Sequence, residues 1–378
     1  MSERPVIPTI GFVLEQTLGH VAHSDNLRNL VPHDERIVPA FASVPFEVDG
    51  WAARVPGYSN WTIRAGVRAA HAIRALERRQ HLAALFIHTQ VPAVLAGRAM
   101  RRIPTVVSVD ATPIQFDQFG ALYAHDRSSD RVERVKWRLN RDAFARAAHV
   151  VSWSEWSKHS LIQHYDVPES KITVLAPGVD VAKWSRPSRR AEQGLRVKIL
   201  FVGGDLERKG GSLLIDAVRR MRLDGHPGAA DLELHLVTNA AVSNEPGIVV
   251  HRGLRPNSPE LIGLYHSADL FCLPTLADCL PMVLSEAGAA GLPLVSTAVG
   301  AIPELVRDGE TGLVVEAGSV DALVDALTRL VGDAGLRSDM GEKAAALVNE
   351  RFDAGKNSRQ IVDILTALVG RSGGGRNA

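Results

Sequence analysis

LPTLADCLPMVLSEAGAAGLPLVSTAVGAIPELVRDGETGLVVE, residues 273–316, contains a strand, a loop with one acid, a helix with a second acid, another strand and a glycine-rich return. The two acids, Asp278 and Glu286, are eight positions apart. Pro281 suits the first turn of a helix, where its missing N–H group is not needed. The unpaired N–H groups of that turn and the positive end of the helix dipole face the same loop. The segment therefore predicts an anion site at the start of a helix.

Strands and helices alternate on both sides of this segment. Alternation of short apolar runs with longer amphipathic stretches predicts an α/β fold with parallel, doubly wound sheets. We expect strands at 9–14, 84–88, 105–109, 149–152, 172–175, 197–202, 232–238, 247–251, 270–273, 294–296 and 312–315. We expect helices at 60–80, 91–100, 211–223, 258–266, 280–290, 301–308, 320–331 and 334–351.

The polar segment 181–194, which contains Pro187, separates two such sets and is interpreted as an interdomain linker. We expect one Rossmann-like domain over 1–180 and a second over 195–355. A helix at 356–370 is expected to pack back on the first domain, and 371–378 is expected to be a disordered tail. Because such sheets bind ligands at the carboxyl ends of their strands, the site is expected in the cleft between the two domains.

Composition excludes several classes of protein. The formal net charge of the 378 residues is +1, which gives no basic field to recruit nucleic acid. The two cysteines, Cys272 and Cys279, form neither a disulfide framework nor a zinc site, so a reducing compartment and a cytoplasmic location are expected. No signal-peptide pattern and no run of ~18 apolar residues is evident in the sequence.

A second motif, ILFVGGDLERKGG at residues 199–211, has the order strand, glycine turn, basic pair, glycine, helix. Arg208 and Lys209 beside flexible glycines suit a diphosphate, because Arg makes bidentate contacts and Lys acts as a point charge. The glycines match neither G-x-G-x-x-G nor a P-loop, which weighs against a nicotinamide dehydrogenase and an ATPase. The alternative is a solvated turn with no ligand.

These motifs, with Pro177-Gly178-Val179-Asp180 before them, resemble the retaining family-4 (group 1) nucleotide-sugar glycosyltransferases. The motif of that family is an acid, seven residues and a Glu, and one variant has Leu-Pro after the first acid, as at Leu280-Pro281. The resemblance implies the GT-B architecture, in which two Rossmann-like domains face each other across a cleft. It places the acceptor side in the N-terminal domain and the sugar donor in the C-terminal domain.

The resemblance also implies roles for single residues. Asp278, which is a Glu in the family, lies near the donor sugar, and Glu286 binds the ribose hydroxyls. Lys209 holds the leaving phosphates. Gly204 stands where the family has an Arg, so Arg208 is expected to supply the guanidinium. The donor sugar and diphosphate are implied to contact the backbone of Gly204, Cys279, Leu280, Pro281, Met282 and Val283.

In the N-terminal half, the candidate residues follow the predicted strands. Gln16, Gly19 and His20 come after the first strand, and Gly19 lets the backbone approach a phosphate. The family usually has two glycines there, and Leu18 holds the first place. His20 and His88 are candidate lining residues for the acceptor or sugar, and simple packing is the alternative.

Asp110 is a further candidate for catalysis. Many relatives carry a His at this place, where it helps orient the sugar or the acceptor. An ionised Asp accepts but does not donate, so it is expected to accept a hydrogen bond from a hydroxyl group. The alternative is an acid that caps the start of a helix.

The segment 126–146 predicts a basic amphipathic helix that includes Trp137. Such a surface suits peripheral contact with an anionic membrane, and an ordinary packed helix with a solvated basic face is the alternative. The sequence has no Asp-x-Asp pair, which metal-dependent glycosyltransferases of the other major fold use, so the reaction is expected to need no metal or other cofactor.

We therefore expect a retaining, hexosyltransferase-type enzyme that moves a sugar from a nucleotide-diphosphate sugar to a hydroxyl group. UDP is the favoured nucleotide and GDP the next. The acceptor is a glycan, a lipid-linked glycan or a small molecule. Two alternatives stay open: a non-catalytic sugar-nucleotide binding protein and a nucleotide-sugar 2-epimerase of the same architecture. The sequence predicts no oligomeric state.

Overall fold

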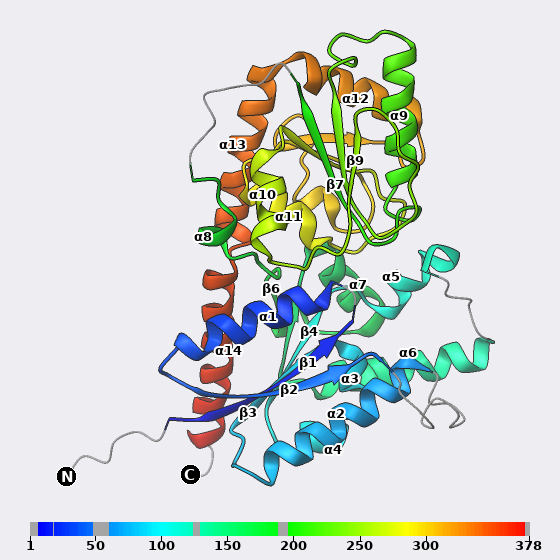
Figure 1. Cartoon of the computed structure of the whole chain (residues 1–378). Helices are drawn as coiled ribbons and strands as arrows, with labels where there is room; N and C mark the ends of the chain where they lie inside the picture. The colour runs from blue at the N-terminus through cyan, green and yellow to red at the C-terminus, as the bar shows by residue number, and fades with distance from the viewer. Residues whose placement is uncertain (1–6, 18, 48–59, 124–128, 188–195, 375–378) are drawn as a thin grey trace. The chain divides into compact units, whose positions relative to one another are not determined.

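The computed structural model describes residues 7–17, 19–47, 60–123, 129–187 and 196–374. They form two compact units, shown in Figure 1: the described residues between 7 and 120, 129–177 and 354–374 belong to unit 1, and residues 121–123, 178–187 and 196–353 to unit 2. Each unit contains a six-stranded sheet in which all strand pairs are parallel. The structure confirms the predicted α/β fold with two Rossmann-like, doubly wound units.

The sheet of unit 1 has the strand order β2-β1-β3-β4-β5-β6. Its strands are β1 (Thr9–Gln16), β2 (Val38–Pro45), β3 (Ala84–His88), β4 (Thr105–Val109), β5 (His149–Ser152) and β6 (Ile172–Val174). The order changes direction between β1 and β3. Open α/β sheets bind ligands at such a switch point, beyond the carboxyl ends of the strands.

The sheet of unit 2 has the order β12-β11-β10-β7-β8-β9. Its strands are β7 (Lys198–Val202), β8 (Glu233–Val237), β9 (Ile248–His251), β10 (Leu270–Leu273), β11 (Leu294–Thr297) and β12 (Gly312–Val315). Numbered from β7, this is the 3-2-1-4-5-6 order of dinucleotide-binding folds. The switch point lies between β7 and β10, whose following loops carry the two sequence motifs.

Helices cover both faces of the unit 1 sheet (Figure 1). One face packs against α2 (Trp61–Glu77), α3 (Gln90–Ala93), α4 (Gly97–Met100), α6 (Asp130–Arg146) and α7 (Glu155–Tyr165). The other face packs against α1 (His20–Leu30) and α14 (Ala354–Gly374). Val362 and Leu365 of α14 are buried with Phe12 and Phe86, so the C-terminal helix belongs to the core of unit 1.

The remaining helices connect or cover the strands. Residues 31–171 add η1 (Val31–His33), α5 (Pro113–Asp117), η3 (Gly120–Tyr123) and η4 (Glu169–Lys171). Unit 2 adds α8 (Val181–Trp184), α9 (Gly211–Leu223), α10 (Pro259–Ser267), α11 (Met282–Ala289), η5 (Ile302–Glu304), α12 (Val320–Gly332) and α13 (Ala334–Arg351). No helix among the described residues is long and apolar enough to cross a bilayer.

Several elements differ from the sequence prediction. Strand β2 was not predicted, because Pro39 and Pro45 argue against a strand; the sheet accepts them because β2 is an edge strand, which does not need every N–H group. The predicted helix 91–100 is two short helices, α3 and α4, separated by residues 94–96. The predicted helix 301–308 is only the 3₁₀ turn η5, which contains Pro303 and follows the left-handed Gly300. Helices α1, α5 and α7 were not predicted.

The predicted domain limits also differ in detail. The chain passes from unit 1 to unit 2 between Pro177 and Gly178. The first residues of the predicted linker form α8, and Trp184 is buried there against the edge of the Tyr265 ring, 5.1 Å between centroids. The rest of that linker, 188–194, lies outside the described residues. Helix α14 continues to Gly374, beyond the predicted end at 370, and 375–378 lie outside the described residues.

Candidate functional site

Two loops of unit 2 are fastened together at the switch point of its sheet. One loop follows β7 and contains Arg208 and Lys209; the other follows β10. The backbone N–H of Leu276 and the hydroxyl of Thr275 donate to the carbonyl of Arg208, at 2.8 and 3.1 Å. Gly210 has a φ of +76°, and a Cβ there would lie 2.0 Å from the carbonyl oxygen of Pro274. Only glycine allows the loops to approach this closely.

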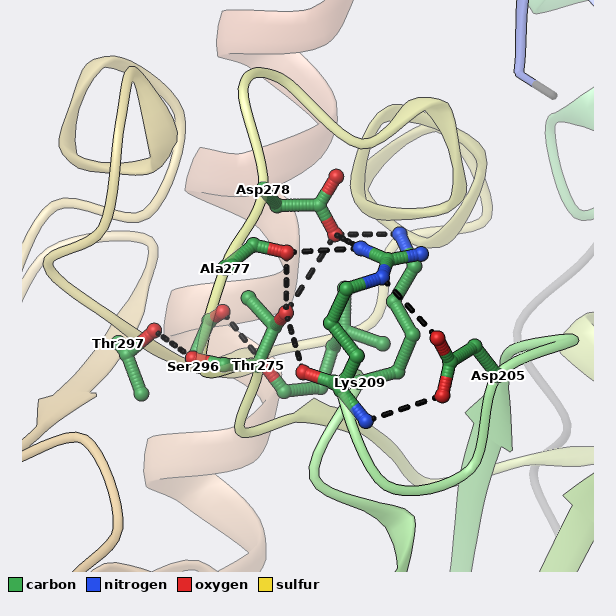
Figure 2. Close-up of polar contacts among 9 residues, drawn as sticks. Asp205, Lys209, Thr275, Ala277, Asp278, Ser296 and Thr297 are labelled. Atoms are coloured by element: carbon green, nitrogen blue, oxygen red, sulfur yellow. Dashed lines mark hydrogen bonds and ion pairs between the residues drawn. The ribbon is translucent and has the colours of Figure 1, made fainter. Parts of the chain in front are cut away.

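These loops bring three predicted residues together, and Figure 2 shows two of them, Lys209 and Asp278. Nζ of Lys209 forms an ion pair with Oδ2 of Asp278, and Nη1 of Arg208 lies 3.8 Å from the same oxygen. Arg208 also donates from Nη1 to the carbonyl of Ala277 at 2.7 Å and from Nε to Asp205 at 3.2 Å. Asp278 is only 7% exposed. This corner thus holds two cations, the buried carboxylate of Asp278 and the more exposed carboxylate of Asp205, and its two cationic side chains suit an anionic ligand.

The helix at the predicted anion site starts two residues later than expected. Pro281 is the N-cap residue of α11 rather than part of its first turn, and the helix starts at Met282. Within the described part of the chain, no side chain caps this N-terminus, so its first N–H groups are not used by a capping side chain. Cys279, Leu280 and Met282 are buried, and Val283 is half-buried.

A turn from the neighbouring strand supports this loop. Gly300 has a φ of +58°, and a Cβ there would lie 2.3 Å from the carbonyl oxygen of Asp278. The N–H group of Ala301 donates to the carbonyl of Cys279 at 2.8 Å. The backbone from Asp278 to Pro281 is therefore held in place before any ligand binds.

Glu286 is buried in α11 and is not an exposed residue on the surface of that helix. It accepts a hydrogen bond of 2.8 Å from the hydroxyl of Tyr265 in α10. Burial raises the pKa of Glu286 to about 7, and the Tyr265 hydrogen bond lowers it by less. Tyr265 is itself packed between Phe271 and Trp184, with ring centroids 5.5 and 5.1 Å away.

Two predicted glycines lie where the fold itself does not require glycine. Gly204 is exposed in the loop after β7, and Gly19 is exposed at the N-cap position of α1. A Cβ at either residue would meet no described atom within 4 Å. Open space at both positions is compatible with close approach of a ligand to the backbone.

In unit 1, three further predicted residues come together at the carboxyl ends of β3 and β4 and the start of α1. Nδ1 of His20 lies 3.0 Å from Nε2 of His88, and Nε2 of His20 lies 3.5 Å from Oδ2 of Asp110. The buried His88 stacks on Trp153, with centroids 5.2 Å apart and ring planes at 8°. Asp110 is not a helix cap, because Thr112 caps α5; that alternative is wrong.

Burial favours the neutral form of the histidine side chains in this cluster. Burial, and then the charge of His20, lower the pKa of His23 to about 3. Burial, with His20 and His23, lowers the pKa of His88 as well. Burial raises the pKa of Asp110, against an opposite effect of His20. At neutral pH the two buried rings, His23 and His88, can each donate one hydrogen bond and accept another.

Glu15 organises the loops around this cluster and was not predicted. It is 3% exposed and accepts hydrogen bonds from Thr17 at 2.6 Å, from the indole N–H of Trp61 at 3.0 Å and from Thr89 at 2.6 Å. Gln16, which was predicted to line the site, donates to the carbonyl of Glu15 at 3.1 Å. Glu15 comes directly after the last apolar residue of β1, and a buried acid at that place needs such partners.

Comparison with known protein families decides the relationship of the chain. A model described as "Glycosyltransferase Family 4" matches residues 33–183, and one described as "Glycosyl transferases group 1" matches residues 196–333. The chain belongs to the family 4 (group 1) glycosyltransferases. The two matches fall on the halves in which the resemblance places the acceptor and donor sides.

Individual relatives and solved structures are consistent with membership of this glycosyltransferase family. A D-inositol 3-phosphate glycosyltransferase of Arthrobacter sp. (strain FB24) is 33% identical over 210 residues, 51% of this chain and 49% of the relative. The chain thus spans about half the length of the curated relatives it matches first. Anabaena Alr3699/HepE in complex with UDP and glucose has a TM-score of 0.68 at 18% identity, covering 95% of this chain and 100% of that one. Sucrose-phosphate synthase (tll1590) of Thermosynechococcus elongatus has a TM-score of 0.73 at 14% identity, with 96% and 100% coverage. At such identities the two structures show the GT-B fold alone.

Proposed function

We propose that the protein transfers a sugar from a nucleoside-diphosphate sugar to a hydroxyl group. The observation that carries this proposal is the cluster of Lys209, Arg208 and Asp278 beside the N-terminus of α11, at the switch point of the unit 2 sheet. Cations and helix N–H groups in one place stabilise the negative charge that develops on a leaving diphosphate. Membership of a glycosyltransferase family supports the same reaction.

In this proposal each donor-side residue has a defined task. Lys209 and Arg208 contact the diphosphate, and Asp278 holds Lys209 in place and accepts from a sugar hydroxyl. Glu286 accepts from the ribose hydroxyls, and the backbone of Gly204 and of residues 279–283 approaches the donor. Because the pKa of Glu286 is about 7, ligand hydroxyls that favour its ionised form would lower that pKa on binding.

The donor is a UDP-sugar in the first instance and a GDP-sugar in the second. The complexes of HepE with UDP, with UDP and glucose, and with UDP-glucose support UDP, although they concern that protein. The reaction is proposed to retain the configuration of a hexose and to need no metal. The bond from the anomeric carbon to the diphosphate breaks, the acceptor oxygen bonds to the same face, and the donor phosphate takes the acceptor proton.

The acceptor is proposed to contact Gln16, His20, His88 and Asp110, with Gly19 near the donor phosphates. Neutral His88 and its neighbour His20 offer both donors and acceptors to a hydroxyl-rich molecule. The relatives named for D-inositol 3-phosphate make this phosphorylated polyol the first acceptor to test. A cytoplasmic location and a membrane contact through residues 126–146 are kept as proposals. The exposed Val135 and Leu139 of α6, beside arginines, support the membrane contact.

A two-step experiment tests the reaction. Thermal unfolding is first measured with UDP, GDP and their sugars for the wild-type protein and Glu286→Ala. Saturation at a hundredfold excess over Kd adds about 2.7 kcal/mol, which gives a clear shift for the wild type and a smaller one for the variant. Release of the nucleotide is then measured with and without inositol 3-phosphate and other polyols.

Each result has one meaning. Acceptor-dependent release of the nucleotide supports the transferase. Nucleotide binding with no turnover for any acceptor favours the sugar-nucleotide binding protein, to which the substitutions at Gly204, Asp110 and Asp278 point. Isomerisation of the donor sugar without an acceptor favours the 2-epimerase. No shift with any nucleotide contradicts the donor site itself.

A further inference from the structure

The buried Tyr265 of α10 contacts the carboxylate of Glu286, the residue proposed to bind the ribose. Its hydroxyl donates a hydrogen bond of 2.8 Å to Oε2 of Glu286. The side chain of Tyr265 is fully buried, so it does not reach a ligand itself. Any contribution of Tyr265 to ligand binding therefore acts through Glu286.

The Tyr265 hydrogen bond leaves one oxygen of this carboxylate open. No described residue donates to Oε1 of Glu286, and Oε1 is not one of the fully buried side-chain atoms that lack a partner. Glu286 as a whole is 6% exposed. An open carboxylate oxygen has two lone-pair positions, which suit the two adjacent hydroxyl groups of a ribose. Glu286 can therefore keep its contact with Tyr265 and bind a ribose at the same time.

Tyr265 is held both at its ring and at its backbone. The ring stacks on Phe271 with planes at 13° and centroids 5.5 Å apart, and the ring of Trp184 meets it at 88°. The guanidinium group of Arg186 donates to the carbonyl of Tyr265 at 3.3 Å, which fixes the end of α10. Because ring and backbone are both fixed, the position of the hydroxyl determines where the carboxylate of Glu286 lies.

The same hydrogen bond affects the charge of Glu286. Burial raises the pKa of Glu286 to about 7, and the hydrogen bond from Tyr265 opposes this effect because it favours the carboxylate. The pKa of Glu286 is thus set by its burial and by one donor.

Other charged groups on the elements beside Glu286 are engaged elsewhere or exposed. Strands β10 and β11 carry no charged residue. The basic residues of α8, α10 and α13 have their own partners: Lys183 with the carbonyl of Asn257, His266 with the carbonyl of Trp184, Arg337 with the carbonyl of Leu330, Lys343 with Asp339 and Arg351 with Glu304. The acidic residues of α10 and α13 are exposed: Glu260, Asp339, Glu342 and Glu350.

We propose that Tyr265 is a positioning residue for the donor: it holds the Glu286 carboxylate with Oε1 open for the two ribose hydroxyls, and so makes the site select ribonucleotides over 2′-deoxyribonucleotides. The inference rests on the proposed function, since it requires that Glu286 binds the ribose. A merely structural Tyr265 would affect the stability of the fold but not the choice between the two sugars or its dependence on pH.

The test is titration calorimetry with UDP-glucose and its 2′-deoxyribose analogue between pH 5.5 and pH 8.5. The diphosphate of UDP-glucose has no group that titrates in this range, whereas the terminal phosphate of UDP has a pKa of about 6. For the wild type, the affinity for UDP-glucose should rise about 30-fold across the range as Glu286 ionises. At pH 8.5 the wild type should prefer UDP-glucose to the analogue by about 10- to 100-fold.

Tyr265→Phe keeps the ring contacts and removes only the hydrogen bond to Glu286. Loss of a hydrogen bond to a charged group should move the midpoint of the pH dependence up by about 1 to 2 pH units. The affinity for UDP-glucose should then fall about 5- to 50-fold at pH 7 and return to within about fivefold of the wild type at pH 8.5. The preference for the ribose should return with it. A general defect in folding would not be rescued by pH in this way.

Two further variants keep the test decisive. Tyr165→Phe removes another buried tyrosine hydroxyl, packed beside Phe144 in unit 1, and should leave the titration curves unchanged. In the Glu286→Gln background, which has no buried carboxylate that needs a donor, Tyr265→Phe should cause no further loss of affinity.

The proposal is overturned if Tyr265→Phe and the wild type have the same midpoint, or if the variant is weakened equally at every pH. A further loss of affinity in the Glu286→Gln background would also overturn it, since Tyr265 would then act through other residues. If the wild type binds neither UDP-glucose nor GDP-glucose at any pH, the donor site itself is contradicted, and this inference with it.

Discussion

The hydroxyl of Tyr265 donates a hydrogen bond of 2.8 Å to Oε2 of Glu286, and both side chains are buried. Burial raises the pKa of Tyr265, so this hydroxyl remains a donor throughout the neutral range. Burial also raises the pKa of Glu286, to about 7, although the hydrogen bond favours the carboxylate. Glu286, the residue proposed to bind the ribose, is therefore close to half-ionised at neutral pH.

This pKa predicts a dependence of stability on pH. Between pH 4.5, the ordinary pKa of a glutamate, and about pH 7, the folded protein keeps a proton on Glu286 that the unfolded chain has lost. The free energy of unfolding therefore falls as pH rises through this range and is level above it. Glu286→Gln removes that fall, so the difference in unfolding free energy between variant and wild type should grow by about 3 kcal/mol from pH 4.5 to pH 8. Urea unfolding at several pH values measures it.

A surface glutamate provides the control. Glu350 is exposed near the end of α13, and Glu350→Gln should give a curve parallel to that of the wild type. If Glu286→Gln also gives a parallel curve, Glu286 has the same pKa in the folded and the unfolded protein, and the burial argument fails.

Removing the charge of Lys209 should weaken the binding of UDP. Lys209→Met leaves the buried Asp278 with Arg208, 3.8 Å away, as its remaining cation, so the pocket loses charge that a diphosphate needs. We expect the affinity for UDP to fall about tenfold to a hundredfold, and kcat of any transfer by a factor of about 10² to 10³. Titration calorimetry with UDP measures the first effect.

Two further variants sharpen that experiment. Lys343→Met removes an exposed lysine that pairs with Asp339 at 2.7 Å on the surface, and it should leave UDP binding unchanged. Adding Asp278→Asn to Lys209→Met removes a carboxylate that repels the diphosphate, so part of the affinity should return. An equal Kd for Lys209→Met and the wild type would exclude a phosphate contact by Lys209.

Substitution by alanine should affect the stability of the protein very differently at two glycines of one loop, Gly210 and Gly204. Gly210→Ala places a Cβ 2.0 Å from the carbonyl oxygen of Pro274 at a φ of +76°, so we expect a loss of more than about 2 kcal/mol in unfolding free energy. Gly204→Ala meets open space and should change stability by less than about 0.5 kcal/mol. If the donor backbone contact exists, Gly204→Ala nevertheless weakens UDP binding. Urea unfolding and UDP titration of both variants decide the matter.

Sequence patterns predict what lies at strand ends but not what meets across the core. Lys209 and Asp278 could be placed together, because the loops after neighbouring parallel strands share one edge of a sheet. Tyr265 and Glu286 come from α10 and α11, and no period or spacing relates them, so their contact follows only from packing. Strand β2 escaped prediction because its prolines are tolerated only at an edge, and edge position is a property of the whole sheet.

Some features missed in the sequence left a visible signal. Thr112-Pro113-Ile114-Gln115 has the spacing of a capping box, and the structure contains that box at the start of α5. Glu15 lies at the end of an apolar strand and not within it, so its burial and its partners Trp61 and Thr89 could be recognised only from the fold.

The histidine cluster predicts a loss of stability in acid. Burial lowers the pKa of His23 to about 3, and the titratable groups near it are His20 and His88, with Asp110 and Glu15 beyond them. The unfolded chain takes up a proton below about pH 6.5 that the folded chain refuses, so stability is lost as pH falls from 6.5 towards 3. His23→Phe keeps the ring contact with Trp153 without the proton. Relative to the wild type, it should gain about 2 kcal/mol between pH 7.5 and pH 5.

Thermal unfolding across that range measures the effect. His33→Phe changes an exposed histidine of η1 and should give no such gain. Equal acid sensitivity in all three proteins would mean that His23 takes up its proton in the folded state, which its burial opposes.

The last prediction concerns Glu15 and Trp61. The Trp61 indole N–H donates to the Glu15 carboxylate at 3.0 Å, whereas the Trp137 indole N–H donates to the neutral carbonyl of His164 at 2.8 Å. Hydrogen bonds to charged groups contribute about 1.5 to 3 kcal/mol and neutral ones about 0.5 to 1.5. Trp61→Phe should therefore lower the free energy of unfolding about twice as much as Trp137→Phe.

A double-mutant cycle isolates this term. Glu15→Gln removes the carboxylate charge and replaces one acceptor oxygen by an NH2 group. In this background, Trp61→Phe should lower the free energy of unfolding only by about the amount expected for a neutral hydrogen bond. Trp137→Phe, whose partner is unchanged, should cost the same in both backgrounds. If Trp61→Phe costs equally with and without the carboxylate, the two loops that carry Thr17 and Thr89 are held by packing, and Glu15 does not organise this end of the sheet.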